Sequence, residues 1–211
     1  MPIPPFHMKW CPPPESRLAA SHPVADVHPW PHHALMNEAA SSCRCASLPD
    51  LAAVPMGGDG LDERVFSTIE NLVDHGGGAW WLHLSQCRAC AQHWMIAQEE
   101  RIFDEHFLRR LTVDEANRIS VDAEWPIEFL SYERVLKTGH ALRIRPCVFL
   151  ERLSPSLVWT AEHLRKERPD ISVEEIALLL GVTATQAKRL LAAASSGQGS
   201  WWQRTRHRLG W

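Results

Sequence analysis

The sequence lacks the patterns that mark a membrane protein, a secreted protein or a common class of enzyme. The chain has 211 residues, and no apolar run in it approaches the roughly 18–20 residues that a membrane-spanning helix needs. The N-terminus has no apolar core followed by small residues at a cleavage site, so we expect no secretory signal and a reducing, cytoplasmic location. There is no phosphate-binding glycine loop, no nucleophile elbow and no pair of acids that stands out from solvated helix faces. We therefore expect no membrane partner and no enzymatic activity.

The sequence also lacks a strong charge of either sign. The formal net charge is −3 with neutral histidines, so the overall balance does not indicate binding to nucleic acid or to a membrane surface. The charges are nevertheless unevenly distributed. Residues 155–211 hold eight Lys and Arg against five Asp and Glu, a balance of +3, which leaves −6 for residues 1–154. The chain thus has an acidic body and a basic C-terminal end.

Cysteine is scarce but concentrated, because four of the six cysteines form two close pairs. Cys87 and Cys90 have the C-x-x-C spacing with which two thiolates of one tight turn bind the same ion, and Cys43 and Cys45 form a C-x-C pair upstream. Four thiolates complete a tetrahedral zinc shell and leave no open position for a water molecule. We predict a structural Zn²⁺ site of the zinc-ribbon-like kind, in which the two cysteine-bearing turns face each other.

Two histidines offer alternative ligands. His83 and His93 flank the C-x-x-C pair, and either could replace one thiolate. The segment His83-x-x-x-Cys87-x-x-Cys90, with Leu84 after the histidine, resembles the H-x-x-x-C-x-x-C signature of zinc-binding anti-sigma factors. This resemblance covers only the short segment itself. It implies that His83 binds the metal and that the segment belongs to a compact helical domain that holds a sigma factor inactive.

A thiol redox site is a further alternative for the C-x-x-C pair. Cys87 follows a predicted strand, as the first cysteine of a thioredoxin-like motif does. The strand–helix–strand pattern that surrounds such a motif is missing from the sequence, so the zinc site is the favoured interpretation.

Composition divides the chain into four segments, and the predicted elements give an α+β fold. Residues 1–40 are rich in proline and histidine and show no helical or strand period, so we expect a disordered tail, within which Met36 is a candidate for the natural start. Residues 41–150 form the predicted zinc-binding α+β domain, in which helices pack with the zinc-ribbon-like element. Residues 151–196 form a predicted helical domain. A Gly/Ser linker then leads into a basic, aromatic tail at 197–211.

Periodicity predicts the elements around the cysteine pairs. Apolar residues at helical spacing predict a helix over 61–73, which Gly76 ends. The apolar, aromatic run 79–84 predicts a strand that leads into the C-x-x-C turn. Residues 92–101 suit either a strand or a helix. We expect a strand there, followed by a helix that ends near Leu111.

Capping signals mark the elements of the second half. Three capping boxes each open a predicted helix, at Thr112, Ser172 and Thr183. Pro126 suits the first position of another helix, and Gly139 suits its end. Residues 142–150 suit a strand, and a further helix is predicted from Ser154 to about Glu167.

The C-terminal helices resemble a helix-turn-helix motif. The apolar and small residues that fall at the spacing of that motif are Ile176, Ala177, Gly181, Val182, Ala187 and Leu190. Gly181 would make the turn, and residues 184–194 would be the recognition helix. Its outward-facing readers of bases or phosphates would be Thr185, Gln186, Lys188 and Arg189. Stacking and phosphate contacts would be added by the tail, with Trp201, Trp202 and Trp211. A three-helix unit that touches no DNA fits the same pattern.

Two functions of different classes follow from these motifs. The first is a non-enzymatic regulator whose zinc is structural and whose C-terminal helices bind duplex DNA. The alternative is a protein-interaction module, such as an inhibitor of the anti-sigma or immunity kind, that binds a protein partner through its acidic body. A zinc or thiol redox enzyme ranks third, because four cysteine ligands would leave no open metal position.

Overall fold

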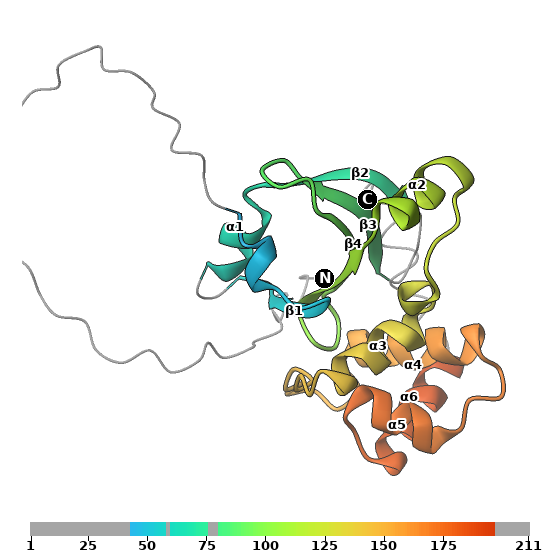
Figure 1. Cartoon of the computed structure of the whole chain (residues 1–211). Coiled ribbons are helices and arrows are strands. Elements are labelled where there is room, and N and C mark those ends of the chain that lie inside the picture. Colours follow the sequence, from blue (N-terminus) through green and yellow to red (C-terminus); the bar gives the residue numbers. More distant parts are fainter. Residues whose placement is uncertain (1–42, 58–59, 76–79, 197–211) are drawn as a thin grey trace, which may run out of the picture.

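The computed structural model describes residues 43–57, 60–75 and 80–196 and has an α+β fold, as the sequence predicts (Figure 1). Its strands are β1 (Leu51–Pro55), β2 (Ile69–His75), β3 (Trp81–Cys87), β4 (His93–Glu99) and β5 (Glu105–Leu111). Its helices are α1 (Leu61–Phe66), α2 (Val113–Asp122), α3 (Tyr132–Ala141), α4 (Pro155–Glu167), α5 (Val173–Leu180) and α6 (Ala184–Ser195). Two short 3-10 helices are η1 (Cys45–Ser47) and η2 (Ile127–Phe129).

The five strands form one antiparallel sheet in the order β1-β5-β4-β3-β2. Strands β2 to β5 follow one another as a meander, and β1 pairs with β5 at the far edge. Figure 1 shows a curled sheet with α1 beside its β1 edge and the helices α3 to α6 grouped below the strands. The β3–β4 connection therefore lies in the middle of the meander, where both of its strands have neighbours on each side.

The two faces of the sheet bury different clusters. Because strand side chains alternate between faces, Leu84, Met95 and Phe107 lie on one face. There they join a continuous core with buried residues of α2 to α6. Cys87 and Trp94 lie on the opposite face, in a smaller cluster with residues of β1, η1 and α1. Helices α2 to α6 thus cover one face, and α1 and the cysteine-bearing segments occupy the other.

The carboxyl group of Glu99 joins the sheet to the helices. Glu99 ends β4 and is 1% exposed. Its oxygens accept the backbone N–H groups of residues 101, 102 and 103 at 2.6–3.0 Å, which closes the turn before β5. The same group accepts the hydroxyl of Tyr132, the first residue of α3, at 2.6 Å. Tyr132 in turn stacks on Trp80, so one buried acid fixes the turn and positions α3 against the sheet.

Two of the three predicted capping boxes are fully formed at the helix starts. Thr112 and Ser172 each accept the N–H of a glutamate three residues later, whose carboxylate reaches back to their own N–H. The third box is half formed. Thr183 accepts the N–H of Gln186 at 3.2 Å, but the Gln186 side chain donates to the carbonyl of Arg152 instead. Helix α4 begins at Pro155, in the first helical position, as predicted.

The helix predicted over 61–73 is wrong in its second half. Helix α1 ends at Phe66, and residues 69–75 form β2. The pairing of β2 with β3 shifts register between Asn71 and Val73. This irregularity breaks the two-residue alternation of the strand, so its apolar residues imitate helical spacing.

The helix predicted to end near Leu111 is also wrong. The strand expected within residues 92–101 is confirmed as β4, but residues 105–111 form another strand, β5. A sharp turn separates the two, with Asp104 in the left-handed region at φ 67°. Ile102 and Phe103 are buried in that turn rather than on a helix face.

Two further expectations fail around α3. Gly139 does not end that helix, which runs on to Ala141. Its lack of a side chain serves packing instead, because a Cβ at this position would lie 2.5 Å from the ring of Phe103. Pro126 precedes the short η2, and α3 begins at Tyr132. Residues 142–150 form no strand.

Several expectations concern residues that the structure does not describe. The predicted tails at 1–40 and 197–211, and the predicted helix end at Gly76, lie outside the described residues. Within the described residues, no single helix is both long enough and apolar enough to cross a membrane.

Glu105 is a buried acid without a full set of partners. It begins β5 and is 8% exposed, and its Oε2 accepts no hydrogen bond from any described residue. Burial, followed by the nearby charges of Asp104 and Glu99, raises the pKa of Glu105 to about 7 from its ordinary value of 4.5. The native state therefore binds this proton more tightly than the unfolded chain does, and the protein loses stability as pH rises through this range.

We predict that Glu105→Gln stabilises the protein at pH 8 by about 1–3 kcal/mol and changes its stability little at pH 4.5. The amide of glutamine does not ionise. In the wild type, the buried carboxylate of Glu105 is ionised above about pH 7, and this burial of charge lowers the free energy of unfolding. Urea unfolding of both proteins at pH 4.5, 6 and 8 measures the difference. A difference that is the same at all three pH values would contradict the account.

Candidate metal centre

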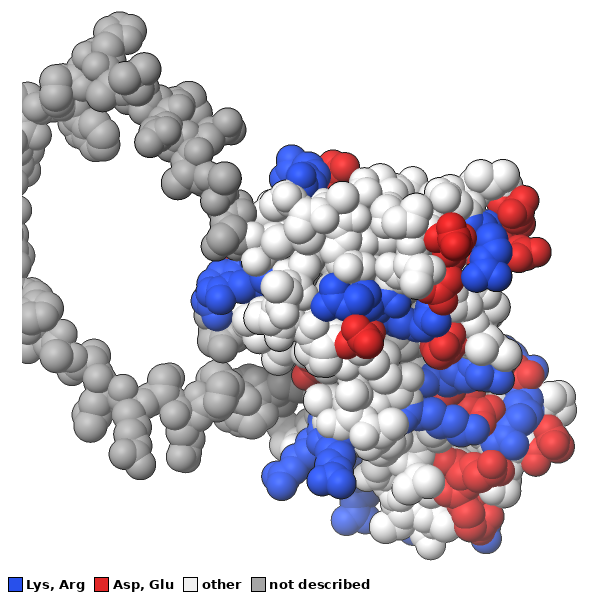
Figure 2. Space-filling model, viewed as in Figure 1, with Lys and Arg blue, Asp and Glu red and all other residues white. Residues whose placement is uncertain are grey.

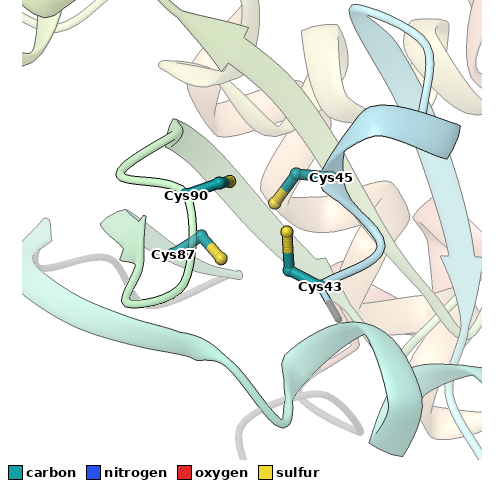
Figure 3. Close-up of side chains that lie close together, drawn as sticks. All are labelled: Cys43, Cys45, Cys87 and Cys90. Atoms are coloured by element: carbon teal, nitrogen blue, oxygen red, sulfur yellow. The ribbon is translucent and has the colours of Figure 1, made fainter. Parts of the chain in front are cut away.

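Four cysteine sulfurs from two distant segments converge on the face of the sheet opposite helices α2 to α6. The Sγ atoms of Cys43, Cys45, Cys87 and Cys90 all lie within 4.8 Å of one another. Figure 3 shows the four side chains pointing toward a common centre, two from the η1 segment and two from the β3–β4 turn. Cys45 and Cys87 are buried, Cys43 is half-buried and Cys90 is exposed. The structure thus brings together the whole predicted cysteine set in a cluster that could hold a metal ion.

The spacing of the sulfurs fits a tetrahedral metal site. Zinc–sulfur bonds of about 2.3 Å at tetrahedral angles place sulfur atoms roughly 3.8 Å apart, within the observed limit. All four ligands come from cysteine, a composition that suits zinc and also iron. Four protein ligands leave no open position for a water molecule or a substrate, so the site has the form of a structural centre.

The β3–β4 turn presents Cys87 and Cys90 through its backbone. The N–H of Cys87 donates to the carbonyl of Gln92 at 2.9 Å, and the N–H of Ala91 donates to the carbonyl of Cys87 at 2.8 Å. Backbone N–H groups of the turn bond to the Cys87 sulfur, and the N–H of Gln92 bonds to the Cys90 sulfur. Such N–H donors stabilise the thiolate form that a metal requires. To close the turn, Ala91 adopts a left-handed conformation with φ 59°.

The η1 segment is fastened to the sheet by Arg110. Its guanidinium donates to the carbonyls of Cys45 and Leu48 at 2.9 and 2.7 Å, and to the side chain of Gln92 at 2.8 Å. The same group lies over the ring of Trp94, 4.5 Å from its centroid. The Trp94 N–H donates to the Cys45 sulfur at 3.4 Å. One β5 arginine therefore holds both ligand-bearing segments.

The thiols of this cluster differ in acidity. Burial raises the pKa of Cys87, but hydrogen bonds with Thr68 and with backbone N–H groups of the turn outweigh it and lower the pKa to about 6. Burial raises the pKa of Cys45 to about 12, although the hydrogen bond from Trp94 acts in the opposite direction. The turn therefore favours the thiolate form of Cys87, whereas burial favours the protonated form of Cys45. Cys45 needs a bound cation to lose its proton.

The two alternative histidine ligands lie away from the cluster. His83 is four residues before Cys87 on β3, roughly 13 Å along the strand. Its Nδ1 atom bonds to Asp74 on β2 at 2.7 Å. His93 begins β4, next to Trp94, and strand alternation places its side chain on the opposite face. Among the described residues, the group of potential ligand atoms within 4.8 Å of one another contains neither histidine.

The predicted DNA-reading residues lie on α6, in the helical part below the sheet (Figure 1). Thr185, Lys188 and Arg189 are exposed, whereas Gln186 is half-buried and bonds to Arg152. The structure places them together on one helix, apart from the cysteine cluster.

The supporting residues of the metal centre are not recognisable from the sequence. Trp94 and Arg110 contact the cluster because β4 and β5 are neighbouring strands, and the register pairs these two residues. Thr68 reaches the Cys87 sulfur at 3.3 Å from the segment between α1 and β2. Trp94 and Arg110 could be identified only from the pairing of β4 with β5. The sequence predicts a helix over residues 105–111, so it does not indicate this pairing.

Comparison with known proteins gives no match: no family model, no curated protein and no solved structure is similar to the chain.

We predict that Ala91→Gly raises the free energy of unfolding by about 0.5–1.5 kcal/mol, because glycine adopts the left-handed conformation without the steric penalty of a Cβ atom. Denaturant unfolding of the metal-loaded protein measures the change. Ala89→Gly is the matched control, since Ala89 lies in the same turn but has no positive φ. The control should be neutral or destabilising, and equal effects of the two substitutions would contradict the prediction.

Proposed function

We propose that the protein is a non-enzymatic regulator built around a structural Zn²⁺ ion bound by Cys43, Cys45, Cys87 and Cys90. The observation that carries this proposal is the convergence of four sulfurs from two separate segments. When bound, the ion would supply the positive charge that neutralises the thiolates and would cross-link η1 to the β3–β4 turn. Around it, the residues of this chain donate hydrogen bonds to the sulfurs and hold the segments in place.

We expect about one zinc per chain, lost when either cysteine pair is removed. The double variants Cys43→Ser/Cys45→Ser and Cys87→Ser/Cys90→Ser should both lose the metal and the cooperative thermal transition, because metal binding and folding are coupled. Elemental analysis and thermal unfolding measure the two effects. The elemental analysis also distinguishes zinc from iron.

His83→Ala is the matched control for the ligand set. It should keep the metal, because His83 bonds to Asp74 and lies outside the cluster. Full occupancy in the Cys43→Ser/Cys45→Ser variant, or loss of metal from His83→Ala, would contradict the four-cysteine site and favour the anti-sigma-like shell.

The regulator would act through duplex DNA bound by α6. Helices α5 and α6 meet at 100° across the short turn 181–183, within the range of helix-turn-helix motifs. Gly181 makes this turn with φ 65°. The side chains of Lys188 and Arg189 are exposed, with no ion pair to any described carboxylate, so both are available to phosphates.

Replacing Lys188 and Arg189 by alanine should weaken duplex binding and reduce the slope of log K against log salt by roughly one to two units. Lys137→Ala/Lys166→Ala is the matched control, because it removes two exposed lysines that already pair with Glu133 and Glu162. Titration of duplex DNA at several salt concentrations measures the slopes. Should the wild type show no salt-sensitive binding, the DNA part of the proposal fails, while the zinc part stands. The alternative interaction module, which binds a protein through its acidic body, would then be the better hypothesis.

A further inference from the structure

A groove lies between the loop that joins α3 to α4 and the turn that joins α5 to α6. Its volume is about 640 Å³. Its floor is apolar, with Leu157 of α4 and Leu180 of α5 almost fully buried beneath it. Pro146 lies against Gly181, where a Cβ atom would come within 2.8 Å of the proline ring. The loop therefore lies close to the turn before α6.

The loop exposes large apolar side chains next to this groove. Val148, Leu150 and Leu153 are 68%, 90% and 46% exposed. A single exposed apolar side chain is ordinary, but three within six residues, beside a hollow with an apolar floor, are typical of an interaction surface.

Cations frame the same surface. Arg152 from the loop and Arg189 from α6 line the groove, while Arg143, Arg145 and Lys188 are exposed on the same two segments. None of these five residues forms an ion pair with a described carboxylate, whereas other Lys and Arg residues do, among them Arg88, Lys137 and Lys166. Figure 2 shows Lys and Arg side chains gathered at the lower left of the helical part, and Asp and Glu side chains at its lower right. One acid, Glu151, also lines the groove, but no described ion pair joins it to any of these cations, so the cations outnumber the acids at this surface.

We propose that this groove binds an acidic peptide segment of a partner protein. A bulky apolar side chain of the segment would enter the groove and contact Val148, and flanking Asp or Glu residues would pair with Arg152 and Arg189. Both features of the surface are then used: the apolar floor is covered, and the unpaired cations gain carboxylates. This inference goes beyond the proposed function and does not depend on the metal or on DNA binding.

The apolar component favours a peptide over a phosphate polymer. Phosphate groups would pair with the arginines but would leave Val148, Leu150 and the groove floor uncovered. The remaining segments of this chain have unsuitable charge. Residues 197–211 hold three arginines and no acid, and the three acids of residues 1–42 are each more than ten residues apart.

The test starts from a phage-displayed library of random 12-residue peptides selected on the full-length wild-type protein. Enriched sequences should carry Asp or Glu on both sides of Leu, Phe or Trp. A synthetic peptide of the enriched sequence should bind more weakly as salt concentration rises. Arg152→Glu and Arg189→Glu should each lower its affinity roughly tenfold or more, because each reversal turns an attractive pair into a repulsive one. Val148→Ser should lower it roughly threefold or more.

Lys188→Glu is the matched control, because Lys188 lies next to Arg189 on α6 but does not line the groove. It should change peptide affinity less than roughly threefold. All four positions are exposed, so circular dichroism and thermal unfolding should show an intact fold. Equal losses from Lys188→Glu and Arg152→Glu would overturn the groove as the site.

Other outcomes would assign the surface to another partner. Failure to enrich acidic peptides overturns the proposal. So does binding of duplex DNA or of vesicles with anionic lipid that depends on Arg152 while the selected peptide does not compete. Enriched peptides that match residues 1–42 or 197–211 would identify a segment of this chain as the occupant instead.

Discussion

Four thiolates within a few ångströms of one another repel, and only a bound cation makes that arrangement favourable. With the proposed metal bound, the position of the η1 segment on this face of the sheet would depend on that constraint. The η1 segment consists of three residues and could not hold its position by its own hydrogen bonds. It is kept in place by Cys45, by the Arg110 bonds to its carbonyls and by the indole N–H of Trp94. The metal would complete this set and lock the segment before β1 to the middle of the sheet.

The opposite face depends on a buried acidic side chain. The Glu99 carboxyl group closes the β4–β5 turn and accepts the Tyr132 hydroxyl, so the position of α3 follows from the end of β4. Strand β4 thus serves both faces: Trp94 supports the cysteine cluster at its start, and Glu99 anchors the helices at its end. Because the sheet joins the two regions, a metal ion bound at the cysteines would also stabilise the fold that presents α6 and the adjoining groove.

The sequence predicts those parts of the molecule that rest on local chemistry. The C-x-x-C and C-x-C pairs, the capping boxes at Thr112 and Ser172 and the start of α4 at Pro155 each need only neighbouring residues. The failures at β5 and Gly139 involve contacts between residues that are distant in sequence. The sequence before and within β5 predicts a helix because it includes Ile102 and Phe103, whose burial in fact occurs in a turn that Glu99 closes. At position 139 a glycine is needed because the ring of Phe103 packs against it. Likewise, the residues next to Arg110 and Trp94 in the sequence do not indicate the strand register that pairs these two residues.

The central claim is that four cysteine sulfurs, and no histidine, surround one structural metal ion. X-ray absorption at the zinc edge of the purified protein tests it most directly, because the method reports the number and kind of the nearest atoms. The account predicts four sulfur neighbours at about 2.3 Å. A nitrogen neighbour at about 2.0–2.1 Å, or fewer than four sulfurs, would contradict it.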